Sequence, residues 1–115
     1  MSAMKELYTL TQFMHEEFPA AIRGWGRVEY FGESGFNVYQ EGEKVLTIQD
    51  YDEFAELIRK WCRAVETWSG ECNGYWLWFA HDYRYDPYHA DYDAVILDSI
   101  IRFGSFGELW LEHCF

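Results

Sequence analysis

The chain has 115 residues, of which half are hydrophobic and 21% are aromatic, and its formal net charge is −11. This length and apolar content are enough to close one hydrophobic core, which excludes intrinsic disorder despite the charge. Nine lysines and arginines against twenty aspartates and glutamates argue against direct binding to a nucleic-acid backbone, because phosphates need neutralising cations. We therefore expect one folded acidic domain over residues 1–115.

The first segment predicts a helix over residues 4–17. Its apolar residues recur every three or four positions, as one face of a helix requires, at Leu7, Leu10, Met14 and Phe18. Pro19 disfavours helical geometry at the residue before it, so we expect the helix to end there.

Three short alternating runs then predict a meander of antiparallel strands between Arg27 and Gln49. The apolar residues of each run share a face, because side chains alternate along a strand. The separating loops, residues 32–35 and 41–42, contain glycine and are short enough to join adjacent strands.

The clearest predicted element is a helix that begins after Asp50. We expect Asp50 to cap it, with Glu53 at the capping-box position, and Ser69 and Gly70 to end it. The stripe expected to pack on the sheet comprises Phe54, Leu57, Ile58, Trp61, Ala64, Val65 and Trp68.

The last third of the chain is harder to assign. Residues 75–84 alternate with aromatic side chains on both faces, which predicts a strand covered on both sides. Residues 93–103 fit a helix or a strand, and their β-branched content favours the strand. A final strand is expected over residues 108–114. The whole predicts an α+β domain, in which an antiparallel sheet of five or six strands packs against two α-helices.

The acidic excess is greatest in this last third, where residues 75–115 carry seven acidic and two basic residues. Pro87 and the surrounding aspartates favour a loop. Tyrosines offer large, rigid contact areas, and carboxylates attract basic residues of a partner. We therefore predict a partner-binding surface made of Asp82, Tyr83, Tyr85, Asp86, Tyr88, Asp91, Tyr92 and Asp93. The alternative is a solvated loop whose tyrosines cover the sheet edge.

Catalytic chemistry has little support in the sequence. There is no phosphate-binding loop and no nucleophile motif, and acidic surroundings would raise the pKa of a thiol such as Cys72. The histidines and aspartates of residues 81–93 match no known metal-ligand spacing, although the sequence leaves a metal there open. We expect no catalytic residues and no cofactor, and a core position for Cys62.

Compartment and membrane contact follow from the apolar pattern and the cysteines. No secretory signal is evident, and the longest apolar run, residues 75–80, is far shorter than the roughly twenty residues of a membrane-spanning helix. Three cysteines, an odd number, are most simply free thiols in a reducing cytosol. A cytoplasmic protein with no membrane partner is expected.

Size, charge and composition together favour a non-catalytic inhibitor that binds a basic nucleic-acid-handling protein or nucleoprotein complex. Phage-type anti-defence proteins, such as anti-CRISPR proteins and DNA mimics, have this general character, as do immunity proteins that neutralise nuclease toxins. We expect the former. A small ligand-binding domain or an enzyme using the aromatic sheet is a weaker alternative, and a homodimer is also compatible with the composition.

Overall fold

The computed structural model describes residues 22, 24–32, 34–68, 74–85 and 94–111, so the predicted helix over residues 4–17 lies outside the described part. The described elements follow the chain in the order β1 (Arg27–Phe31), β2 (Gly35–Gln40), β3 (Glu43–Ile48), α2 (Tyr51–Thr67), α3 (Gly74–Tyr85) and α4 (Ala94–Phe106).

The predicted meander is confirmed. The three strands form one antiparallel sheet in the order β1-β2-β3, with Val28 opposite Val38 and Phe36 opposite Ile48. The turn between β2 and β3 contains Gly42 at a φ of 85°, a conformation that glycine adopts without steric cost. The strand pairing places the predicted apolar residues on one face of the sheet, where Phe36 contacts Phe54 of the helix that follows.

The predicted cap of α2 is also confirmed. The carboxylate of Asp50 accepts a hydrogen bond of 2.9 Å from the backbone N–H of Glu53, which satisfies a donor that the first turn leaves free. Glu53 in turn accepts the N–H of Gln49 at 3.3 Å. The buried side of α2 carries the predicted core residues Phe54, Ile58, Trp61, Cys62 and Val65, together with Ala55.

The strand predicted over residues 75–84 is wrong, because these residues belong to helix α3. Aromatic residues favour strands in general, but here they are spaced for a helix: Trp76, Phe79, Ala80 and Tyr83 are all buried. The indole of Trp61 on α2 contacts the rings of Trp76 and Phe79 edge to face, at centroid distances of 6.2 and 5.7 Å. Packing against α2 therefore selects the helix.

The preference for a strand over residues 93–103 is also wrong. The buried residues Ile96, Leu97, Ile100 and Ile101 form one face of helix α4. The helix runs through Gly104, where a Cβ would lie 2.7 Å from Leu57 Cδ2. Glycine thus lets α4 approach α2 closely rather than ending the helix.

The end of α4 is set three residues later. Gly107 has a φ of 72°, and its N–H donates to the carbonyl of Phe103 at 2.9 Å, as in a left-handed helix cap. Residues 108–111 form no strand, and residues 112–114 of the predicted last strand lie outside the described part. The prediction of five or six strands and two helices is therefore corrected to a three-stranded sheet and three helices over the described residues, still an α+β fold.

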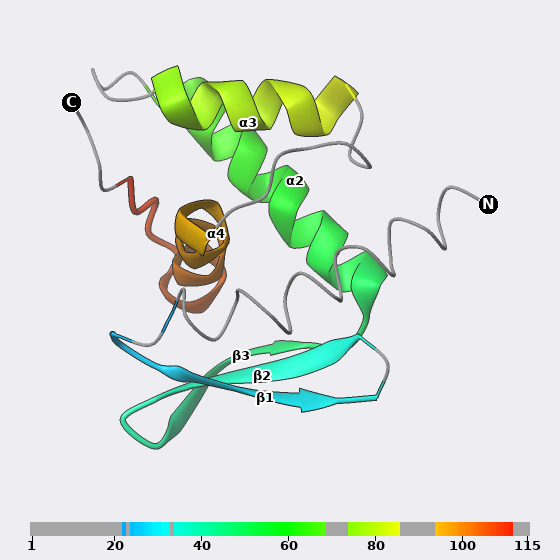
Figure 1. The fold of residues 1–115 in the computed structure, drawn as a ribbon, viewed down its shortest axis with the longest axis vertical. Helices are drawn as coiled ribbons and strands as arrows, with labels where there is room; N and C mark the ends of the chain where they lie inside the picture. The colour runs from blue at the N-terminus through cyan, green and yellow to red at the C-terminus, as the bar shows by residue number, and fades with distance from the viewer. Residues whose placement is uncertain (1–21, 23, 33, 69–73, 86–93, 112–115) are drawn as a thin grey trace.

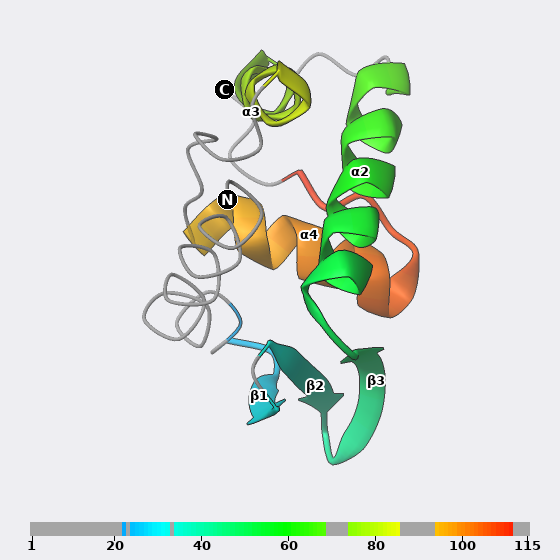
Figure 2. The same cartoon turned by 90° about the vertical axis from the view of Figure 1, so that its right-hand side faces the viewer.

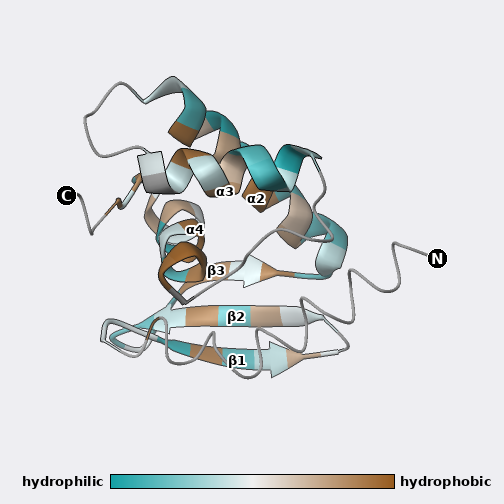
Figure 3. Cartoon of the chain, turned by 45° about the horizontal axis from the view of Figure 1, so that its top comes forward, coloured by the Kyte–Doolittle hydropathy of each residue, from teal (hydrophilic) through white to brown (hydrophobic). Residues whose placement is uncertain are grey.

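The elements are stacked along the longest direction of the molecule. Figure 1 shows the sheet at one end, α3 at the opposite end and α4 between them, while α2 runs from the sheet to α3. The side view in Figure 2 shows the same order. In Figure 3, hydrophobic and hydrophilic segments alternate along β2, as expected for a strand with one covered face. Helix α3 is thus the element most remote from the sheet.

Candidate functional site

Helix α3 carries aromatic residues on both of its sides. Trp76 has no exposed surface, whereas Trp78, two residues later, is 73% exposed and Tyr85 is 87% exposed. Trp78 and Tyr85 are seven residues apart, which places them two turns apart on the same side of the helix. The inner side packs against α2, whereas the rings of Trp78 and Tyr85 lie on the side that faces away from α2.

Two polar residues lie between these exposed aromatic residues on the same side of α3. His81 is exposed and Asp82 is partly exposed, at the third and fourth positions after Trp78. We call the set of Trp78, His81, Asp82 and Tyr85 the α3 outer face. Tryptophan and tyrosine are enriched at the centres of protein-binding surfaces, whereas polar groups are more common at their rims.

A shallow depression of about 350 Å³ adjoins this face, lined by Glu66 of α2 and by His81, Arg84 and Tyr85 of α3. Arg84 Nη1 donates to both carboxylate oxygens of Glu66, at 2.9 and 2.8 Å. This hydrogen bond and the charge of Glu66 raise the pKa of Arg84 above its ordinary value. The pair links the two helices at the surface and leaves the ring of Tyr85 facing solvent.

The predicted partner-binding residues do not share one environment. Asp82 and Tyr85 lie on the α3 outer face, on a helix and not on the predicted loop. Tyr83 is only 3% exposed and stacks on Phe79 with ring centroids 6.1 Å apart, so it belongs to the core and cannot contact a partner. The other five predicted residues, Asp86, Tyr88, Asp91, Tyr92 and Asp93, lie outside the described residues.

Sequence reasoning missed Trp78, the most exposed tryptophan among the described residues. A strand would place Trp76 and Trp78 on the same face, whereas the helix separates them. The signal was the spacing of Trp76, Phe79, Ala80 and Tyr83, which matches one buried helix face and leaves Trp78 and Tyr85 opposite.

Nucleophilic chemistry at Cys62 conflicts with its surroundings. The side chain is buried in the core, and burial raises the pKa of its thiol to about 12. A thiol in that environment is protonated and inert at neutral pH. Within the described ranges, no group of three or more potential metal ligands occurs. Of the histidines and aspartates of residues 81–93 that the sequence offers as metal ligands, the described ranges include only His81 and Asp82.

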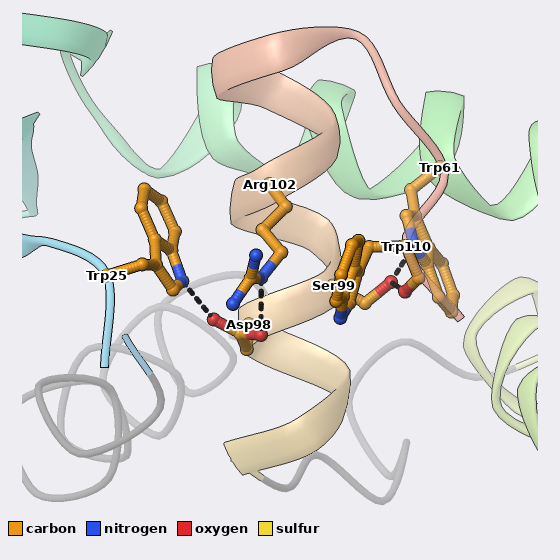
Figure 4. Close-up of polar contacts among 6 residues, drawn as sticks. All are labelled: Trp25, Trp61, Asp98, Ser99, Arg102 and Trp110. Atoms are coloured by element: carbon orange, nitrogen blue, oxygen red, sulfur yellow. Dashed lines mark hydrogen bonds and ion pairs between the residues drawn. The ribbon is translucent and has the colours of Figure 1, made fainter. Parts of the chain in front are cut away.

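A second polar cluster lies on α4 and is engaged within the protein (Figure 4). Asp98 is buried, and it accepts a 2.6 Å hydrogen bond from the indole N–H of Trp25 and a 2.9 Å bond from Nε of Arg102. The guanidinium of Arg102 lies over the rings of Trp25 and Trp110, at 5.0 and 4.5 Å from their centroids.

Ser99 connects this cluster to α2. Its hydroxyl accepts a 3.0 Å bond from the indole N–H of Trp61 and donates a 2.6 Å bond to the carbonyl of Trp110 (Figure 4). Buried polar groups with such partners hold elements together. We therefore interpret the α4 cluster as structural. It holds three parts of the chain against α4: Trp25, which precedes β1, Trp61 of α2, and Trp110, which follows α4.

No family model, curated protein or solved structure matches the chain. Among the described residues, no helix has the length and apolar character required to cross a bilayer. The features that bear on function are therefore the geometry of α3 and the charge of the chain.

Proposed function

We propose that this chain is a non-catalytic, cytoplasmic inhibitor that binds a basic nucleic-acid-handling protein or nucleoprotein complex, and that the α3 outer face is the centre of the contact. The exposure of Trp78 and Tyr85 on one side of one helix carries the proposal. Buried tryptophan and tyrosine anchors contribute most of the binding energy in many interfaces, whereas a soluble monomer gains nothing by exposing them together.

The charge of the chain supports a basic partner. The net charge is −11, and three aspartates, Asp86, Asp91 and Asp93, follow within eight residues of Tyr85 in the sequence. Carboxylates around an aromatic centre attract lysines and arginines and speed association. A protein that handles nucleic acid presents such residues where it holds phosphate, so an acidic protein bound there would block it.

Within this class we favour a phage-type anti-defence protein, as in the expectation from composition, and place an immunity protein against a nuclease toxin second. Both act by occupying a basic surface. They differ in the target, a nucleoprotein defence complex in the first case and a single nuclease in the second.

The proposal is tested by capture and then by inhibition. Proteins bound to the immobilised chain from host cytosol at low salt are identified by mass, and each purified candidate is assayed for nucleic-acid binding or cleavage with and without the chain. We expect a basic target whose activity the chain inhibits and whose association slows as salt rises. A well-folded chain that inhibits none of the captured proteins would refute the proposal.

Matched variants locate the contact. Trp78→Ala and the triple reversal of Asp86, Asp91 and Asp93 to lysine should each weaken inhibition strongly. Glu43→Lys reverses one exposed charge at the start of β3, at the end of the molecule opposite α3 (Figure 1), and should have only a small effect. A triple variant that loses its cooperative thermal transition would instead assign those aspartates to the fold.

A further inference from the structure

We propose that the depression beside the α3 outer face receives an arginine side chain of the partner, with Glu66 as the carboxylate acceptor and Tyr85 as the stacking surface. This inference rests on the proposed function and names the chemical group that the site recognises. It starts from the lining of the depression, which places a carboxylate, a cation and an exposed ring around one hollow.

Glu66 has remaining capacity to accept hydrogen bonds. Its two oxygens both bind a single nitrogen of Arg84, Nη1, so each oxygen keeps a lone pair for another donor. The side chain of Glu66 is also partly exposed to the depression. An incoming guanidinium can present two N–H groups to such a carboxylate at once, which a lysine ammonium cannot do with the same geometry.

Tyr85 supplies the second element of recognition. Its ring is almost fully exposed at the edge of the depression and offers a flat face on which a guanidinium can stack. The planar, weakly hydrated guanidinium stacks on an aromatic ring better than an ammonium group does.

Among the described residues, guanidinium groups already lie over aromatic rings that are close to a carboxylate. The guanidinium of Arg27 lies 4.2 Å from the ring centroid of Tyr39, whose hydroxyl donates to Glu29 at 3.3 Å. In the α4 cluster, a guanidinium lies over two indoles and pairs with a buried carboxylate. At the depression, the carboxylate and the ring are present and the ring faces solvent.

Arg84 is an internal competitor in this arrangement. It is largely exposed and holds Glu66 through one nitrogen, so it can turn away when a better placed guanidinium arrives. Removing Arg84 should therefore strengthen the binding of an arginine-bearing partner by more than the loss of an exposed cation elsewhere does, because the carboxylate of Glu66 becomes free. A purely structural ion pair would show only the general gain that the loss of any cation gives an acidic chain.

Hexa-arginine and hexa-lysine peptides of equal charge are suitable probes, titrated against the full chain and followed by backbone amide chemical shifts. We expect tighter binding of hexa-arginine, with shifts at the depression. Glu66→Gln should weaken that binding about tenfold, the loss expected for charge-assisted hydrogen bonds. Arg84→Met should strengthen it severalfold.

Charge-matched controls separate this site from general attraction. Glu43→Gln and Lys44→Met make the same charge changes on exposed residues of β3, remote from α3. An effect of Glu66→Gln no larger than that of Glu43→Gln, or a gain from Arg84→Met no larger than that from Lys44→Met, would overturn the inference. Binding of inorganic phosphate at the depression in preference to hexa-arginine would also overturn the inference, because His81 and Arg84 would then act as an anion site.

The inference and the proposed function can fail separately. If Trp78→Ala abolishes inhibition of the target while Glu66→Gln and Arg84→Met leave it unchanged, the α3 outer face is the contact and the arginine site is wrong. If the peptide titrations follow the expected order but the chain inhibits no captured protein, the arginine site holds and the proposed function is wrong.

Discussion

Replacing each of two neighbouring tryptophans by alanine tests the helical assignment of α3 and the exposure of its outer face together. Trp76 has no exposed surface and packs against Trp61, whereas Trp78 is 73% exposed. The substitutions are chemically identical and only two residues apart, so a difference in stability reports their environments.

The expected costs differ severalfold. Trp76→Ala leaves a cavity in the core and should lower the free energy of unfolding by about 3–5 kcal/mol. A tryptophan buries roughly 200 Å² when it is covered, and the covered quarter of Trp78 is worth about 1.3 kcal/mol at about 25 cal/mol per Å². Alanine returns about 0.5 kcal/mol through its higher helix propensity, so Trp78→Ala should cost less than about 1 kcal/mol.

Urea unfolding followed by far-ultraviolet circular dichroism measures both costs without relying on tryptophan fluorescence. A domain of this size has a free energy of unfolding of about 5–15 kcal/mol, so the loss of Trp76 should be evident. Equal costs for the two variants would refute the reasoning, because equal burial of the two side chains is what a strand over residues 75–84 requires.

Three further predictions concern the core and its titratable groups. Trp61→Ala should cost about 3–5 kcal/mol in the same assay, because Trp61 is fully buried and its N–H is bonded. Asp98→Ala should cost about 3 kcal/mol, since it leaves the largely buried guanidinium of Arg102 without its carboxylate; Asp98→Asn, which keeps an acceptor, should cost less. Burial raises the pKa of the Cys62 thiol and of the Tyr30 hydroxyl to about 12, from 9.0 and 10.0. Both groups lose their protons more readily in the unfolded chain, so the Tm should fall as the pH rises above about 9. Cys62→Ala should remove the part of this fall in Tm that begins at the lower pH, because the unfolded thiol has the lower pKa of the two groups.

The first part of the described fold could be predicted from the sequence because its signals are local. Asp50 and Glu53 specify the start of α2, and alternation with short glycine turns specifies the meander. These features depend on residues close together in the chain, so they are visible without the tertiary structure.

Helices α3 and α4 could not be assigned in the same way because tertiary packing overrides local preference there. The aromatic residues of α3 and the β-branched residues of α4 favour strands by propensity, yet both segments pack as helices against α2. Gly104 lies inside α4 and allows the close approach of this helix to Leu57. That role depends on a contact across 47 positions of sequence, which no local pattern shows.

The same limit applies to the candidate site. The sequence predicted an acidic, tyrosine-rich surface that includes Asp82 and Tyr85, and the structure places these two residues on the α3 outer face. It could not separate Tyr83 from Tyr85, or Trp76 from Trp78, because that separation depends on whether the segment is a helix or a strand.

The most direct test of the α3 outer face is the dissociation constant of the Trp78→Ala variant for the inhibited target, measured beside Glu43→Lys. A tryptophan at the centre of the contact should contribute 2 kcal/mol or more, so we expect the affinity of Trp78→Ala to fall about 30-fold or further. Glu43→Lys should bind nearly as the unchanged chain does. If Trp78→Ala binds within about twofold of the unchanged chain, at unaltered stability, the α3 outer face is not the contact.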